Sequence, residues 1–216
     1  MIIIPIGSQC SSATFKNSIE KTCTYSLPFD WMFSSPSFVF EMLVLLLEKN
    51  MNTEVLVKDH FFYCEKRENI GCVENYYTCV NRTALYNTKY KVIFPHDYDN
   101  NETIHKYIRR FERLKDLILN SNENIYFIYA SHSSLENGNI TIDGTFIIKD
   151  VYIYLTKIYK LIGKFRKNYK IVLFDAIQEE NPEILDNNII LYKLNKCDHW
   201  YKLIPQMTEH ISFLKK

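Results

Sequence analysis

Residues 2–10 read IIIPIGSQC and carry the features expected of a buried strand that turns directly into a helix. The apolar run through Ile6 predicts the strand, and Gly7 permits a sharp turn. Ser8 suits the cap of the following helix, so that Cys10 falls in the first helical turn. The positive end of the helix dipole favours a thiolate there. Cys10 is therefore a candidate nucleophile, and a small buried core residue is the alternative interpretation.

The rest of the chain alternates between short apolar runs and longer stretches with helical periodicity. Strands are expected at residues 2–6, 90–94, 125–130, 171–174 and 189–194, and helices at 9–20, from 36 onward, and over about 104–118, 148–162 and 201–214. Strands separated by long helices favour an α/β fold with a mostly parallel central sheet and helices on both faces. We expect one α/β domain over residues 1–216, with an inserted hairpin or cap at about 50–88.

Composition excludes several classes of function. The chain has 26 Lys and Arg against 25 Asp and Glu, a formal net charge of +1, so nothing indicates a nucleic-acid or membrane-surface partner. Its apolar runs are too short to span a bilayer, and no positive residue precedes the first of them, which favours a soluble cytoplasmic protein without a secretion signal. The six cysteines include no CxxC pair. Reduced thiols are expected, with no metal and no cofactor.

Polar residues that follow strands are the candidates for a site, because ligands of an open parallel sheet bind beyond the carboxyl ends of its strands. They include the parts of a nucleophile, base and orienter system. Spacing alone does not rank the three histidines among them. The set is Ser8, Cys10, His96, Asp97, His132, Asp175, Asp198 and His199.

Two further groups are ambiguous. Asp30, in Phe29-Asp30-Trp31, is either a structural cap or a site residue. Arg109 and Arg110 belong either to a solvated helix face or to an anion-binding site that uses the planar guanidinium. Residues expected to bind substrate are Ser8, Gln9, Arg109, Arg110, His132 and His199.

Four motifs occur in an order that resembles a papain-like cysteine peptidase family of bacteria and large DNA viruses whose function is not established. They are Ile6-Gly7-Ser8-Gln9-Cys10, Leu27-Pro28-Phe29-Asp30-Trp31, Phe94-Pro95-His96-Asp97 and Tyr107-Ile108-Arg109-Arg110-Phe111. The resemblance runs from residue 2 to about 130. It implies Cys10 as nucleophile and His96 as its base, with Asp30 or Asp97 orienting the ring, and a papain-like α+β fold as the alternative architecture. A viral member would act in the host cytoplasm.

The favoured hypothesis is a cysteine hydrolase, peptidase-like, or an acyl transferase acting on a peptide or on a small acyl or glycan substrate. Backbone amides around residues 9–11 would stabilise the oxyanion. One alternative is a noncatalytic interaction protein built on an α/β scaffold. Another is an esterase-like hydrolase that uses Ser8 with Asp198 and His199.

Overall fold

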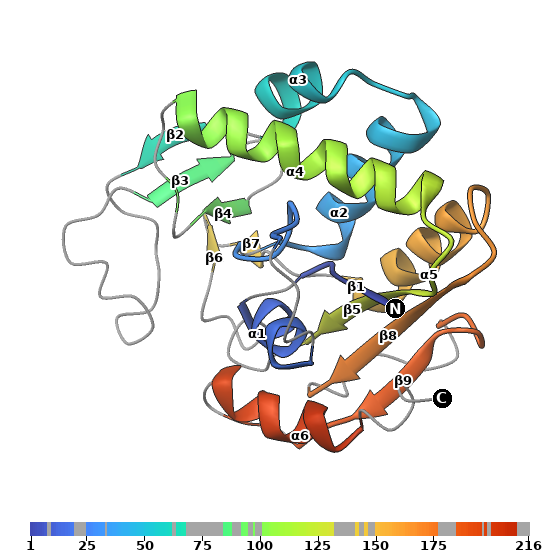
Figure 1. The fold of residues 1–216 in the computed structure, drawn as a ribbon. Helices are drawn as coiled ribbons and strands as arrows, with labels where there is room; N and C mark the ends of the chain where they lie inside the picture. Colours follow the sequence, from blue (N-terminus) through green and yellow to red (C-terminus); the bar gives the residue numbers. More distant parts are fainter. Residues whose placement is uncertain are drawn as a thin grey trace.

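Four parallel strands form the central sheet of the protein, in the order β1–β5–β8–β9 (Figure 1). Their bounds are Ile2–Pro5, Ile125–Ala130, Tyr169–Asp175 and Ile190–Lys193. The computed structural model describes residues 1–7, 10–19, 25–32, 34–61, 64–67, 84–87, 92–94, 97, 101–131, 141–142, 145–146, 150–176, 185–195, 197 and 200–210. The parallel sheet confirms the predicted α/β class over the α+β alternative.

Helices cover both faces of this sheet, as predicted, because successive side chains of each strand point to opposite faces. One face packs against α2 (Pro36–Leu43), α4 (Asn101–Asn120) and α5 (Val151–Ile162), and it includes Ile4, Phe127 and Leu173 from the strands. The other face packs against α1 (Cys10–Ile19) and α6 (Leu203–Glu209), which lie on the opposite side of the sheet from α4 in Figure 1.

Short helical elements continue two of these segments. A π-helical turn, η1 (Val44–Glu48), extends α2, and α3 (Thr53–Leu56) runs into a second one, η2 (Val57–Phe61). The 3-10 turn η5 (Trp200–Lys202) precedes α6. Ser35 begins α2 by accepting a hydrogen bond from the Phe38 amide, as the Ser35-Pro36 pair suggests.

A second, antiparallel sheet corrects one expectation. It consists of β2 (Cys64–Arg67), β3 (Ala84–Asn87) and β4 (Val92–Phe94). The strand predicted at residues 90–94 is therefore present but pairs with β3 and not with the central sheet. His96 and Asp97 were selected because ligands bind beyond the carboxyl ends of parallel strands. That reason does not apply to them, because β4 is not a strand of the parallel sheet. Strands β6 (Thr141–Ile142) and β7 (Thr145–Phe146) form a separate two-stranded ladder.

Buried aromatic rings connect the second sheet to α4. Phe61 lies at the centre of this group, with ring centroids 4.7 Å from Tyr107, 4.8 Å from Phe111 and 5.2 Å from Phe94. Phe29 also contacts Phe111, at 5.9 Å. Edge-to-face ring pairs of this kind stabilise a core beyond the area they bury. The loop that carries Asp30 and the strand that precedes His96 therefore share one core.

No helix among the described residues has both the length and the apolar character needed to cross a bilayer.

Gly7 makes the turn between β1 and α1 with a backbone φ of +117°, a conformation that other residues adopt only with strain. A Cβ at this position would lie 3.0 Å from Ser34 Oγ and 3.1 Å from both Ser34 O and Tyr129 Cε2. The turn is closed by the Ser12 hydroxyl, which donates to Gly7 O at 2.7 Å. Gly7 is therefore required for both its conformation and its small size.

Replacing Gly7 with alanine should lower the free energy of unfolding by about 1–3 kcal/mol, through backbone strain and crowding against Ser34 and Tyr129. Urea denaturation measures the change. Asn17→Ala is the control, because Asn17 is exposed on α1 and the substitution should leave the midpoint unchanged or slightly raised. Equal stability of Gly7→Ala and the native chain would contradict this account of the turn.

Candidate functional site

Cys10 is the first residue of α1, as the sequence predicts. The turn before it lies at the carboxyl edge of the central sheet, where the Ala130 amide donates to Gly7 O at 3.4 Å. The backbone of Cys10 is therefore at the edge where an open α/β sheet binds its ligands. The side chain of Cys10, and all of Ser8 and Gln9, lie outside the described residues.

Two buried hydroxyl groups lie next to this turn. Ser11 follows Cys10, and Ser34 Oγ is the atom closest to the position of a Cβ on Gly7. Both side chains are fully buried, and neither hydroxyl has a hydrogen-bond partner among the described residues. Buried hydroxyl groups are ordinarily satisfied. The interior beneath the Cys10 turn is consequently polar, with unused hydrogen-bonding capacity.

Asp30 is buried in an ion pair with Lys16 of α1. Its Oδ2 accepts from Lys16 Nζ at 2.8 Å and from the Leu27 amide at 2.9 Å. Oδ1 is buried and has no partner among the described residues. Burial raises the pKa of Asp30, while the charges of Lys16 and Arg110 act in the opposite direction. Asp30 therefore links α1 to the loop before α2 and keeps one carboxylate oxygen uncommitted.

Asp97 is held by two residues of α4. Tyr107 donates its hydroxyl to Oδ2, and Lys106 pairs with Oδ1. Burial, together with the adjacent Asp97 carboxylate, raises the pKa of Tyr107 well above its usual value, so the hydroxyl remains a donor. Both oxygens of Asp97 are thus engaged, and the chain just after His96 is anchored to α4.

Arg110 lies one helical turn beyond Tyr107 and stacks on the Tyr107 ring, with 5.1 Å between the guanidinium carbon and the centroid. The charge of Arg110 lowers the pKa of Asp30, and the charge of Asp30 in turn raises the pKa of Tyr107. Three of the predicted site residues, Asp30, Asp97 and Arg110, therefore share one electrostatic neighbourhood around Tyr107. Arg109, one residue earlier, is exposed and belongs to the solvated face of α4.

The three candidate histidines, His96, His132 and His199, lie outside the described residues, as does Asp198. The residue before His132 is described. Ser131 donates to Asp175 Oδ1 at 2.8 Å, and Tyr152 donates to the other oxygen of the same buried carboxylate. Asp175, a strand-end residue selected from the sequence, thus joins the ends of β5 and β8 to α5.

Lys16, Lys106 and Tyr107 are the residues that sequence reasoning missed. Lys16 is 1% exposed, which is rare for a lysine, and Tyr107 was named in the fourth motif of the resemblance but given no role in the site. A lysine between Phe15 and Ile19 on a short helix is the one local signal that could have indicated a buried cation. Its partner, Asp30, is fourteen positions away, and no periodic pattern in the sequence relates the two residues.

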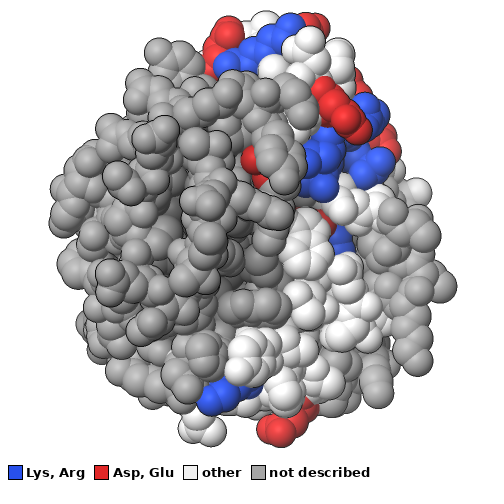
Figure 2. All heavy atoms as spheres, turned by 90° about the vertical axis from the view of Figure 1, so that its left-hand side faces the viewer, with Lys and Arg blue, Asp and Glu red and all other residues white. Residues whose placement is uncertain are grey.

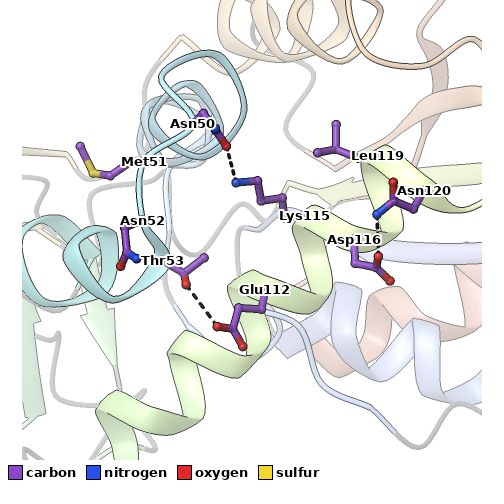
Figure 3. A pocket seen from close by; sticks show the side chains of 9 residues that line it. All are labelled: Asn50, Met51, Asn52, Thr53, Glu112, Lys115, Asp116, Leu119 and Asn120. Carbon is purple, nitrogen blue, oxygen red and sulfur yellow. Dashed lines mark hydrogen bonds between the residues drawn. The ribbon is translucent and has the colours of Figure 1, made fainter.

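A hollow of about 510 Å³ lies between α4 and the segment that precedes α3 (Figure 3). Its lining is polar, and its side chains largely bond one another: Lys115 donates to Asn50, Thr53 to Glu112 and Asn120 to Asp116. None of the predicted site residues lines it. The described part of the chain also holds no group of three or more His, Cys, Asp or Glu side chains arranged for a metal ion.

The fold and the turn define an α/β protein with a cysteine at the junction of its first strand and first helix. A family model described as putative papain-like cysteine peptidase (DUF1796) matches residues 1–143, which include this junction, Asp30 and Asp97. The chain belongs to that family. No match was found among curated proteins or among solved structures.

The buried ion pair of Lys16 and Asp30 predicts that substitutions of its two members have strongly coupled effects on stability. Lys16→Met and Asp30→Asn should each lower the free energy of unfolding by about 3–5 kcal/mol, because each leaves a buried charge without its partner. The double variant should lose much less than the sum. Denaturant unfolding of all four proteins measures the coupling.

The exposed pair of Lys58 and Glu54 is the matched control, with side chains 49% and 56% exposed. Lys58→Met and Glu54→Gln should show a coupling below about 0.5 kcal/mol. Additive losses for Lys16 and Asp30 would show that the ion pair does not hold α1 to the loop.

Proposed function

We propose that the protein is a cysteine-dependent hydrolase or acyl transferase in which Cys10 is the nucleophile and His96 the base. The observation that carries the proposal is the position of Cys10 as the first residue of α1, shortly after the Gly7 turn and at the carboxyl edge of the sheet. Family membership supports it, because the family model spans this junction and the His96 segment.

The start of α1 suits both halves of the chemistry. Amides in the first turn of a helix lack intrahelical partners and carry the positive end of the helix dipole, which favours a thiolate. The same amides can donate to the oxygen that becomes negative when a thiolate attacks a carbonyl carbon. The thiolate forms a carbon–sulfur bond, the imidazolium protonates the leaving amine or alcohol, and the acyl group passes to water in a hydrolase or to another acceptor in a transferase.

The described residues on either side of His96 support its role as base. Phe94 packs on the Tyr107 ring at 5.8 Å, and Asp97 accepts the hydrogen bond from the hydroxyl of the same side chain. The described residues that flank Pro95-His96 in the sequence thus both contact one tyrosine. A base must be held in place to take and return a proton efficiently.

Asp30 is the better candidate for orienting the imidazole. Asp97 has one oxygen bound to Tyr107 and the other to Lys106, whereas Asp30 keeps Oδ1 uncommitted and buried. A carboxylate acceptor of this kind can fix the tautomer of a histidine and stabilise its charged form. Asp97 then acts as an anchor for the histidine segment.

The proposal predicts selective alkylation of Cys10. Iodoacetamide at neutral pH should modify Cys10 at least about tenfold faster than Cys197, a half-buried cysteine that is not in a disulfide, and faster than the other four cysteines, because a thiolate reacts and a thiol does not. The rate at Cys10 should also level off at lower pH than the rate at Cys197. Peptide mass spectrometry at several times and pH values measures both rates.

Histidine variants identify the base. His96→Ala should slow alkylation of Cys10 and shift its pH profile upward, whereas His105→Ala, which removes an exposed imidazole on α4, should not. If His132→Ala or His199→Ala produces the effect instead, the assignment of His96 is wrong. Similar labelling of all six cysteines would refute the nucleophile itself.

A further inference from the structure

Arg110 forms no ion pair with the described residues, although its charge acts on Asp30. It is half-buried and lies over the Tyr107 ring, and no carboxylate or carbonyl among the described residues accepts a hydrogen bond from it. Arginine that is withdrawn from solvent is ordinarily paired, because each of its five N–H groups needs an acceptor. Within the described part of the chain, the donors of Arg110 are therefore available to a ligand.

Three cations near Arg110 already have partners. Lys16 pairs with Asp30, Lys106 pairs with Asp97, and Arg113 donates to the Ser26 carbonyl at 2.9 Å. Each of the two carboxylates in this cluster is thus in an ion pair with a lysine. Arg110 has no such ion pair with any residue that the structure describes.

The position of this charge relates it to the proposed site. Arg110 follows Tyr107 by three residues, a rise of about 4.5 Å along the helix, and Tyr107 anchors the chain on both sides of Pro95-His96. Figure 2 shows Lys and Arg side chains gathered on the upper part of one face of the molecule, beside acidic ones. A group bound at Arg110 would therefore lie near Tyr107, the residue that Phe94 and Asp97 both contact.

We propose that Arg110 binds an oxyanion, a carboxylate or a phosphate, carried by the substrate. Such an anion accepts two parallel hydrogen bonds from a guanidinium, and the contact with the Tyr107 ring restricts the motion of this one. That the anion is part of a substrate rests on the proposed function as a hydrolase or transferase. The binding of the anion itself does not. The substrate class is thus an acyl compound that carries a second, negatively charged group.

Isothermal titration calorimetry at constant ionic strength tests the site with two probes, succinate for a carboxylate and inorganic phosphate for a phosphate. The native protein should bind one of them with a stoichiometry of one. Arg110→Gln should weaken that binding at least tenfold, and Arg110→Lys should weaken it nearly as much, because an ammonium group is not a planar fork. The stronger probe identifies which oxyanion the site takes.

Lys160→Gln is the control for the loss of one positive charge, since Lys160 is exposed on α5 away from this cluster, and it should leave binding within twofold of native. Equal losses for Lys160→Gln and Arg110→Gln, or no binding of either probe, would overturn the proposal. The titration does not depend on the reactivity of Cys10. An unreactive Cys10 with intact anion binding would refute only the hydrolase, and a reactive Cys10 without anion binding would refute only the anion site.

Discussion

The buried Tyr107 side chain is the contact on which the proposed site depends. Its hydroxyl is a donor to the Asp97 carboxylate, its ring packs against Phe61 and Phe94, and Arg110 lies over the ring. A hydrogen bond between a neutral donor and a charged acceptor gains strength in an interior of low dielectric constant. One residue of α4 thereby contacts the second sheet, the residue that follows His96 and the Arg110 guanidinium.

Among the described residues around Tyr107, Asp30 and Asp97 each pair with a lysine, and Arg110 pairs with neither. Burial of Asp30 with Lys16 costs desolvation energy, and such pairs seldom add net stability compared with apolar residues. They do fix geometry, because neither member can move without leaving a charge unpaired. The pair thus determines how α1, which begins at Cys10, sits against the loop of Asp30. This rigidity is useful beneath a strand-to-helix turn that depends on glycine at position 7.

The α/β class, the sheet strands and the long helices were predictable from the period of apolar residues, and Ile125–Ala130 agrees with its expected bounds. The strand before His96 shows where that reasoning fails. Its apolar character was evident, but pairing with β3 places it in an antiparallel sheet. The periodicity of apolar residues indicates that a segment is a strand. It does not indicate which strand it pairs with, because pairing depends on contacts between residues far apart in the sequence.

The amino-acid sequence by itself determined the alternation of strands and helices, the glycine turn before Cys10 and the family to which the chain belongs, because these depend on local order along the chain. Only the tertiary structure decided that Lys16 pairs with Asp30, that Tyr107 and Lys106 hold Asp97, and that Arg110 forms no ion pair with any residue the structure describes. The physical reason is that electrostatic pairing depends on distance and burial in space, and the separations of these residues along the chain follow no period that could reveal it.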